Sequence, residues 1–193
     1  SQPDQSLIKT NPDFEKIHAV ILAGGESKRM GKKNKLLVPI NGKPMVALTA
    51  ETMIASKANS VAAVTGFEHR KIQEAIKILN IEFIHNENFQ NGISSSVVTA
   101  IRSSPEDCSA ILIGLGDMPK ITVSHINKLI DAYNPLEGRA ICVPTWKGKR
   151  GNPVLWARRF FPEMLQLKGD FGAKELMGKY AELVVEVEMN DNG

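Results

Sequence analysis

Hydrophobic residues along this chain fall into two alternating patterns. Short, almost wholly apolar runs occur six times, at residues 18–22, 60–64, 81–85, 110–115, 140–144 and 183–187. Runs of this length and character are typical of strands that are buried on both faces of a parallel sheet. We therefore expect six strands at these positions.

Helical spacing fills the intervals between the runs. Apolar residues recur every three or four positions in four stretches, at 46–54, 72–79, 93–101 and 126–133. Pro44 precedes the first stretch, and Thr122 has the position and chemistry of an N-cap for the last. Strands that alternate with single helices predict a sheet covered on both faces. The predicted fold is a three-layer α/β/α domain with a mainly parallel sheet.

Composition narrows the class of protein. The 193 residues, 42% of them hydrophobic, fit one globular domain that buries about 70% of its unfolded surface. A formal net charge of +3 suits an acidic small molecule and is too weak to predict nucleic-acid binding. No run approaches the ~20 apolar residues of a membrane-spanning helix, and no signal peptide opens the chain. We expect a flexible, polar arm over residues 1–16 and a single domain over 17–193.

Cysteine and histidine usage indicates neither a disulfide framework nor a metal cluster. Cys108 and Cys142 lack the spacing of metal ligands, and Cys142 lies within an apolar run. Both are expected to be reduced thiols, which points to the cytoplasm. The four histidines are scattered along the chain, and His85 is interpreted as a strand-end residue without a metal.

The end of the first predicted strand carries the clearest chemical pattern. The apolar run passes into Gly24 and Gly25, and the cations that follow are Lys28, Arg29, Lys32, Lys33 and Lys35. Adjacent glycines let the backbone approach a ligand closely, and the cations would neutralise a triphosphate. The spacing matches neither the P-loop nor the dinucleotide fingerprint. The pattern indicates a nucleotide site of another kind, the alternative being a tight turn with a solvated basic rim.

A single carboxylate follows the strand at 110–115. The sequence there reads Gly116, Asp117, Met118 and Pro119. Mg²⁺ binds one or two carboxylates together with phosphate oxygens and water, so Asp117 is a candidate metal ligand. Ligands in such sheets bind beyond the carboxyl ends of the strands, where this residue lies. The alternative is a turn in which Asp117 bonds to its own backbone.

A third strand end combines an amide with a helix start. Asn86 follows the run at 81–85, and Gly92–Ser96 opens the next predicted helix. The free N–H groups at a helix start favour an anion or an acceptor on a base edge. We expect Gly92 and Ser94 to face the nucleotide, and we interpret Ser95 and Ser96 as capping or surface residues.

In chain order, these motifs resemble those of the molybdenum cofactor cytidylyltransferases and their guanylyltransferase relatives, the MobA-like nucleotidyltransferases. The resemblance extends from His18 to about Val187. Its segments are Leu22–Gly25, Arg29–Gly31 with Lys35, Asn41–Pro44, His85–Asn86, Asn91–Ser96, Gly116–Pro119, Gly148–Leu155 and Gly169–Ala173.

The motifs do not all resemble the same branch of that family. The double glycine at 24–25 is more similar to the guanylyl branch. The segments at 92–96, 116–119 and 150–153 are more similar to the cytidylyl branch, and we give these three more weight. Relatives continue into an acidic Asp-x-Asp-Thr-Pro segment where this sequence reads Asp191–Gly193.

The resemblance implies a Rossmann-like fold of the nucleotide-diphospho-sugar transferase type and a specific reaction. An enzyme with Mg²⁺ as cofactor would transfer CMP from CTP to the phosphate of molybdopterin or the molybdenum cofactor, releasing pyrophosphate. Residues 17–120 would hold the nucleotide and residues 121–193 the acceptor. A molybdoenzyme or its chaperone would receive the product, and no nucleic-acid or membrane partner is expected.

Three alternatives stay open. Within the same reaction class, GTP replaces CTP, or the acceptor is a sugar phosphate or another small phosphorylated molecule. In a different class, the chain is a non-catalytic carrier or chaperone for molybdopterin. Such a carrier would tolerate loss of Lys35 or Asp117, and both residues are present.

The resemblance also assigns roles to individual residues. Leu22, Ala23 and Gly24 would line the base and phosphates, together with the adjacent Gly25. Lys35 would contact the nucleotide, and Thr65 and Asn86 would face the nucleoside. Asp117 matches the metal-binding aspartate. The residues expected to face the acceptor are Arg150, Asn152 and Asp170.

The chemistry of the reaction fits these residue types. An acceptor phosphate is already an anionic nucleophile near neutral pH and needs no strong general base. The reaction needs in-line positioning and neutralisation of charge on the α-phosphate and the leaving pyrophosphate. Lys35, Arg29 and a Mg²⁺ ion on Asp117 are the groups expected to supply that neutralisation.

Overall fold

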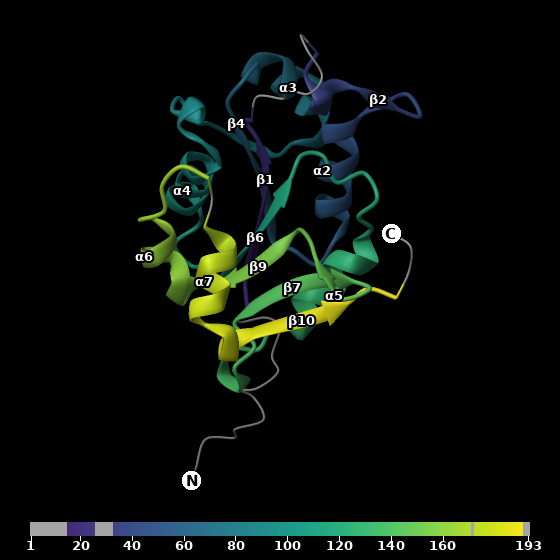
Figure 1. Ribbon diagram of the computed structural model, residues 1–193. Coiled ribbons are helices and arrows are strands. Elements are labelled where there is room, and N and C mark those ends of the chain that lie inside the picture. Colours follow the sequence, from purple (N-terminus) through teal and green to yellow (C-terminus); the bar gives the residue numbers. More distant parts are fainter. Residues whose placement is uncertain (1–14, 26–32, 171, 191–193) are drawn as a thin grey trace.

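A computed structural model describes residues 15–25, 33–170 and 172–190, and its centre is an eight-stranded sheet (Figure 1). The strands are β1 (Ile17–Ala23), β4 (Ser60–Thr65), β5 (Glu82–His85), β6 (Ala110–Leu115), β7 (Ile141–Trp146), β8 (Lys149–Arg150), β9 (Val154–Ala157) and β10 (Val184–Glu188). Their order is β10-β7-β9-β6-β1-β4-β5, with β8 paired to β7. All six predicted strands are present.

Strand direction brings the expected sites to one edge of the sheet. β1 is parallel to both β4 and β6, and Leu22 lies opposite Val64 and Leu115. β9 is antiparallel to β6 and to β7, so β6 and β7 run the same way. The carboxyl ends of β1, β4, β5, β6, β7 and β10 therefore share one edge, where ligands bind in sheets of this kind.

Helices cover both faces of the sheet. Their bounds are α2 (Met45–Ala55), α3 (His69–Ile76), α4 (Ile93–Ser103), α5 (Val123–Ala132), α6 (Phe161–Met164) and α7 (Ala173–Lys179). α2, α3 and α5 pack on one face and α4, α6 and α7 on the other (Figure 1). In β1, Ala19 and Ile21 pack against α2, α3 and α5, and Val20 and Leu22 pack on the face covered by α4, α6 and α7. Because both faces are buried, the strand is apolar throughout. The predicted three-layer fold is confirmed.

The ends of several elements follow local rules. Thr122 caps α5: its Oγ1 accepts a hydrogen bond from the His125 N–H, while the Thr122 N–H donates to His125 Nδ1. Asn41 and Gly42 both have positive φ and join β2 (Pro39–Ile40) to β3 (Lys43–Pro44) in a tight hairpin. The prediction that Thr122 caps α5 is confirmed.

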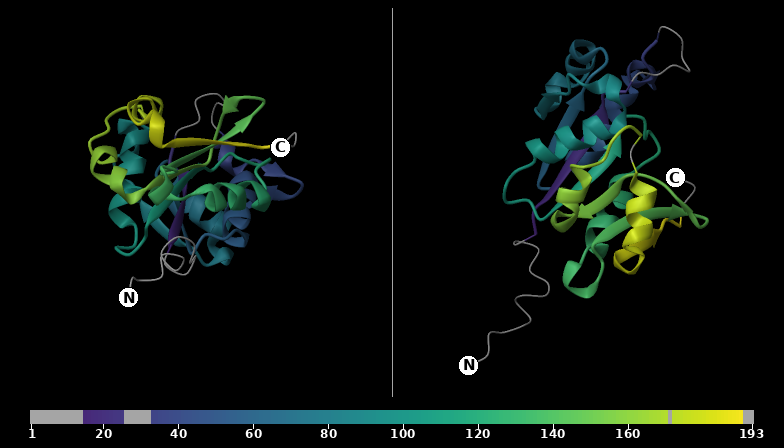
Figure 2. Two further views of the ribbon diagram at one scale, coloured as in Figure 1. Left: turned by 90° about the horizontal axis from the view of Figure 1, so that it is seen from below. Right: turned by 60° about the vertical axis from the view of Figure 1, so that its left-hand side comes forward.

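Short elements complete the fold. The 3-10 turns are η3 (Lys35–Leu37), η4 (Lys77–Leu79), η5 (Phe89–Asn91), η6 (Pro135–Glu137), η7 (Arg158–Phe160) and η8 (Ala181–Leu183). α7 and β10 lie toward one end of the molecule and α3 toward the other, while β1 runs along the length between them (Figure 2). In the sheet, the strands of residues 17–120 (β1, β4, β5 and β6) are neighbours on one side, and the later strands β7, β9 and β10 are neighbours on the other.

The remaining predictions concern the termini and the thiols. Of the predicted arm at residues 1–16, only Glu15 and Lys16 are described, and both contact the body of the domain. Ser109 Oγ donates to Glu15 (2.8 Å) and Lys16 Nζ pairs with Asp107 (2.7 Å). Burial raises the pKa of the Cys142 thiol to about 12, as expected for a packed, unreactive cysteine. None of the helices in the described part of the chain is long and apolar enough to cross a membrane.

Candidate active site

The two glycines after β1 have different surroundings. Gly24 packs against the end of β4, because an added Cβ would lie 3.2 Å from Gly66 N. Its carbonyl accepts a hydrogen bond from the Phe67 N–H (3.1 Å). An added Cβ on Gly25 would meet no described atom within 4 Å. Gly24 therefore lies in close contact with β4, whereas the described residues leave room at Gly25 for a ligand to approach the backbone.

The predicted lysine and aspartate meet at this edge. Lys35 Nζ lies 3.1 Å from Asp117 Oδ2, with the two side chains 46% and 31% exposed. Asp117 lies two residues after the end of β6, and the intervening Gly116 N–H bonds to the Leu22 carbonyl of β1. The pair therefore lies beside the start of the glycine turn. Arg29 lies outside the described residues.

Close packing between η3 and the end of β6 supports the Lys35–Asp117 ion pair. Leu36 covers Gly116 so tightly that an added Cβ there would lie 2.9 Å from Leu36 Cδ2. Asn34 Oδ1 accepts a hydrogen bond from the Leu36 N–H, and Thr49 Oγ1 donates to the Gly116 carbonyl. These contacts hold η3 over the end of β6 and bring Lys35 to Asp117.

Asp117 is a suitable ligand for Mg²⁺. The described residues include no group of three or more His, Cys, Asp or Glu side chains that could enclose a metal ion. Asp117 instead offers one partly exposed carboxylate at the carboxyl ends of β1 and β6, where the nucleotide is expected; we call this part of the sheet the nucleotide edge. Mg²⁺ keeps several waters and commonly takes its remaining ligands from one or two carboxylates and substrate phosphates. The residues present fit that mode of binding.

Asn86 joins the end of β5 to the start of α4. It is 3% exposed, and its Nδ2 donates to Ser95 Oγ (2.8 Å) and Ser96 Oγ (3.1 Å). Its Oδ1 accepts a hydrogen bond from the Asn88 N–H. Both amide hydrogens are thus used within the protein. Ser95 and Ser96, which the sequence suggested were capping or surface residues, hold Asn86 in place.

Thr65 lies at the neighbouring strand end. It is 2% exposed, and its Oγ1 is 3.4 Å from His85 Nδ1. The His85 ring in turn stacks on His69, with centroids 4.0 Å apart. Burial and the nearby His85 lower the pKa of His69. Two of the histidines that looked scattered in the sequence are therefore neighbours at the edge where Thr65 lies.

The start of α4 is also tied to a distant loop. Gly92 has a φ of +98°, and an added Cβ would lie 2.5 Å from the Gly169 carbonyl oxygen. That same oxygen accepts a hydrogen bond from the Ser94 N–H (3.1 Å). The predicted anion-binding N–H of Ser94 is thus occupied by the loop that carries Asp170.

A cavity of about 720 Å³ extends to the end of β1. It begins at Leu22, the β1 residue two positions before Gly24. Its walls are mainly apolar, and its lining residues are Leu22, Ile93, Ile113, Leu115, Val143, Arg150, Gly151, Asn152, Val154, Trp156, Asp170, Ala173, Lys174 and Met177. The structure therefore brings the three predicted acceptor residues, Arg150, Asn152 and Asp170, to one cavity. We call it the acceptor cleft, after the role that is expected of these three residues.

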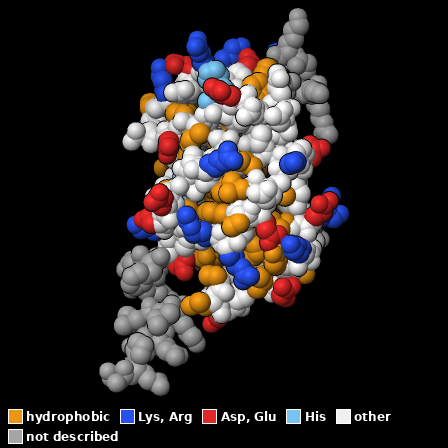
Figure 3. All heavy atoms as spheres, turned by 90° about the vertical axis from the view of Figure 1, so that its left-hand side faces the viewer, with side chains coloured by type: hydrophobic (Ala, Val, Ile, Leu, Met, Phe, Trp, Pro, Cys, Tyr) orange, Lys and Arg blue, Asp and Glu red, His pale blue; other side chains and the backbone are white. Residues whose placement is uncertain are grey.

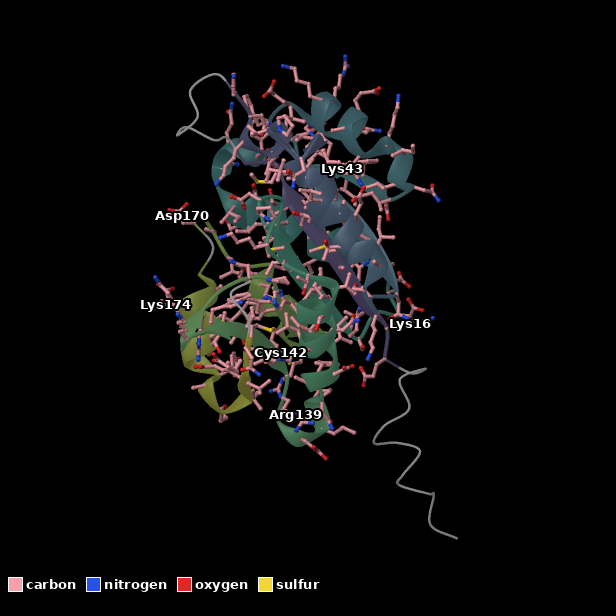
Figure 4. The ribbon with its side chains drawn as sticks, turned by 90° about the vertical axis from the view of Figure 1, so that its right-hand side faces the viewer. Lys16, Lys43, Arg139, Cys142, Asp170 and Lys174 are labelled. Carbon is pink, nitrogen blue, oxygen red and sulfur yellow. The ribbon has the colours of Figure 1, made fainter. Side chains whose placement is uncertain are left out.

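Polar side chains lie at the rim of the acceptor cleft. Arg150, Asn152, Asp170 and Lys174 are all exposed. Asp170 and Lys174 project from the same side of the molecule, from the loop before α7 and from α7 itself (Figure 4). On the face that includes α4 and α7, hydrophobic side chains gather centrally with Lys and Arg side chains among and around them (Figure 3). An acceptor with an apolar or planar body and a charged end would fit such a lining.

Comparison with known proteins identifies the family. The model of the MobA-like NTP transferase domain matches residues 19–184. The chain belongs to the MobA-like NTP transferase family. It is therefore a nucleotidyltransferase, and the predicted family is confirmed.

Individual relatives of this nucleotidyltransferase differ in the names they carry. Purine catabolism protein PucB of Bacillus subtilis (strain 168) is 29% identical over 166 residues, covering 82% of this chain and 78% of PucB. A probable molybdenum cofactor guanylyltransferase of Thermococcus sibiricus is 30% identical over 162 residues, covering 83% and 77% of the two chains.

Solved structures share the fold. Rv0371c of Mycobacterium tuberculosis H37Rv is similar with a TM-score of 0.80 and 22% identity, covering 91% of this chain and 89% of that one. A complex of Rv0371c with manganese gives a TM-score of 0.76 at 21% identity, covering 90% and 88%. This similarity confirms the predicted fold.

Sequence reasoning about this MobA-like protein missed Lys174 at the rim of the cleft and Glu186, the partner of Arg150. Glu186 on β10 accepts hydrogen bonds from Nε and Nη2 of Arg150 (3.2 and 3.0 Å), while Arg150 Nη1 lies 3.7 Å from Met177 Sδ. Lys174 follows the Gly169–Ala173 motif directly, so its position was a usable signal. Glu186 gave none, because it meets Arg150 only when β8 and β10 pair with β7.

Proposed function

We propose that this MobA-like nucleotidyltransferase transfers CMP from CTP to the phosphate of molybdopterin or the molybdenum cofactor and releases pyrophosphate. The observation that carries the proposal is the position of Leu22. This residue lines the acceptor cleft, lies two positions before Gly24, and accepts a hydrogen bond from the Gly116 N–H next to Asp117. A nucleotide on the glycine turn and an acceptor in the cleft would meet across one residue of β1.

The nucleotide side supplies charge and shape. The open space at Gly25 would let the backbone approach the phosphates, and Lys35 and Arg29 would neutralise their charge. Asp117 would hold a Mg²⁺ ion, which supplies charge stabilisation on phosphate oxygens when bound. The manganese complex of the structurally similar Rv0371c supports a divalent metal in this fold. Asn86 would act indirectly, by fixing the start of α4.

The acceptor side supplies recognition. Arg150 and Asn152 would bind the polar groups of the acceptor at the rim, with Asp170 on the opposing loop, while the apolar walls would hold its ring system. The acceptor phosphate needs only to be held in line with the α-phosphate, since it is already a nucleophile.

Guanylyl transfer is the second candidate. The double glycine at 24–25 and the guanylyltransferase relative of Thermococcus sibiricus favour it. The segments at 92–96, 116–119 and 150–153 favour the cytidylyl reading, which we adopt.

The buried free thiols Cys108 and Cys142 support a reducing compartment, the cytoplasm. A molybdoenzyme or its chaperone would be the recipient of the product.

A nucleotide panel tests the proposal. Purified protein is incubated with Mg²⁺, molybdopterin and each of CTP, GTP, ATP and UTP, and pyrophosphate release is followed. We expect turnover with CTP. Turnover with GTP alone would replace CMP transfer by GMP transfer. Binding of molybdopterin without turnover of any nucleotide would favour the carrier.

A further inference from the structure

The Lys35–Asp117 pair joins two groups that the proposed reaction uses separately. Lys35 would bind a phosphate, and Asp117 would bind a divalent cation. In the structure the Lys35 ammonium lies 3.1 Å from Asp117 Oδ2, an oxygen that a bound metal ion would use as a ligand. The lysine therefore neutralises the carboxylate that a metal would need.

The pair is held in position from both sides. Asn34 caps η3, and Leu36 packs on Gly116, so the backbones of residues 35 and 117 have a fixed relation. The side chains themselves are partly exposed and have room to move. The Lys35–Asp117 ion pair can therefore be broken and replaced by other contacts without unfolding η3 or the end of β6.

A second positive charge on Asp117 would face Lys35 at short range. Two cations a few ångströms apart repel each other even when partly exposed, so they cannot share the carboxylate without cost. A triphosphate removes this conflict, because its oxygens attract the ammonium and also contribute ligands to the metal.

We propose that Lys35 is an internal counter-ion that keeps divalent cations off Asp117 until a nucleotide arrives. Phosphate then draws Lys35 away, and the metal takes its place on the carboxylate. Metal and nucleotide bind cooperatively as a result, and neither binds well alone. This proposal rests on the proposed function, because it takes Asp117 as the metal ligand and Lys35 as a phosphate ligand.

The contact could instead be an ordinary surface ion pair, and the chain offers a matched control. Lys43 and Glu51 form a pair of the same type and exposure, at 3.0 Å with side chains 57% and 37% exposed. Lys43 also lies apart from the side that carries Asp170 and Lys174 (Figure 4). A variant at Lys43 removes a comparable charge without touching Asp117.

The test is binding of Mn²⁺, measured by electron paramagnetic resonance of the free ion, without nucleotide and then with CTP. The proteins are the wild type, Lys35→Met, Lys35→Arg, Lys43→Met and Asp117→Asn. Circular dichroism checks that each is folded, which the exposure of these side chains favours. Binding that remains in Asp117→Asn is subtracted as adventitious.

Without nucleotide, Lys35→Met is expected to bind Mn²⁺ about fivefold more tightly than the wild type, the equivalent of one exposed ion pair released. Lys35→Arg and Lys43→Met should match the wild type. CTP should tighten Mn²⁺ binding in the wild type by a larger factor than in Lys35→Met.

Two results would overturn the proposal, and they differ from failure of the proposed function. If Lys35→Met binds Mn²⁺ alone no more tightly than Lys43→Met, Lys35 does not exclude the metal. If CTP tightens metal binding equally in both proteins, the two ligands are not coupled through Lys35. If the wild type binds no Mn²⁺ with CTP, or if binding is unchanged in Asp117→Asn, the nucleotide and metal site itself is wrong.

Discussion

The nucleotide edge and the acceptor cleft of this protein are built in different ways. The nucleotide edge consists of the tips of parallel strands, where backbone groups and one ion pair are set by strand register. The acceptor cleft is closed by the antiparallel strand β9, the two-residue strand β8 and the seven-residue helix α7. Register fixes the first part closely, whereas short elements and loops shape the second. Acceptor choice can therefore change on this fold with little change to the nucleotide edge.

The acceptor cleft should depend strongly on the buried core beneath it. Trp156→Ala removes a fully buried ring from β9 under the cleft and should lower the free energy of unfolding by about 3–5 kcal/mol. Urea unfolding followed by fluorescence measures the loss. Trp146→Ala, at a half-buried ring that lies on Gly151, is the matched control and should cost less. Equal losses would mean that Trp156 does not anchor the cleft.

The glycines of the nucleotide edge separate packing from binding. An added Cβ at Gly66 would lie 2.6 Å from Phe89 Cβ and 2.7 Å from the Gly24 carbonyl, so Gly66→Ala should cost about 1–3 kcal/mol of stability. Gly25→Ala has room and should unfold at nearly the same urea concentration as the wild type. Its effect should appear instead as a higher KM for the nucleotide. A destabilised Gly25→Ala protein with an unchanged KM would contradict this distinction.

Rim variants should affect the acceptor alone. Arg150→Ala removes a guanidinium from the cleft and should raise the KM for the acceptor about tenfold. The expected increase is modest because the Arg150 guanidinium is already paired with Glu186. The KM for CTP should change little. Steady-state kinetics with each substrate varied in turn provide the comparison, and Lys147→Ala, in the exposed β7–β8 turn, is the control. Equal changes in both KM values would mean that the two parts are not independent.

Acidification should destabilise the protein through a residue remote from both parts. His18 is buried at the opposite end of β1, and burial lowers its pKa. Below its ordinary pKa of about 6.5, the unfolded chain binds a proton that the folded protein does not. The free energy of unfolding should therefore decrease as the pH is lowered below about 6.5. One proton accounts for at most about 1.4 kcal/mol per pH unit.

Urea unfolding of the wild type and His18→Gln at pH 7.5 and 5.5 measures this effect. The difference between the two pH values should be smaller in His18→Gln. The same difference in both proteins would remove His18 as the cause.

Much of the fold follows from the sequence because it depends on periodicity over many residues. The six strands and four long helices produce clear apolar patterns, and Thr122 marks a helix start by its own chemistry. α6 and α7 were missed because four and seven residues are too few to display a helical period, and the four-residue apolar run of β9 was not singled out as a strand. Their absence from the prediction concealed the antiparallel part of the sheet.

The site divides in the same way. Lys35 and Asp117 could be singled out because each follows a recognisable motif, and the structure brings them together. The bonds from Asn86 to Ser95 and Ser96 could not be foreseen, since they depend on how β5 approaches α4. The pairing of Glu186 with Arg150 depends on three strands at once. Long-range packing left no local trace in these cases.

Turnover of Asp117→Asn tests most directly whether the nucleotide reacts at the tip of β6. The substitution keeps size and shape but removes the charge that would hold the metal, so kcat for pyrophosphate release should fall by about 10²–10³-fold. The free energy of unfolding should change by no more than about 1 kcal/mol, because the pair with Lys35 is partly exposed. Wild-type turnover in a folded Asp117→Asn protein would contradict the assignment of this edge as the catalytic site.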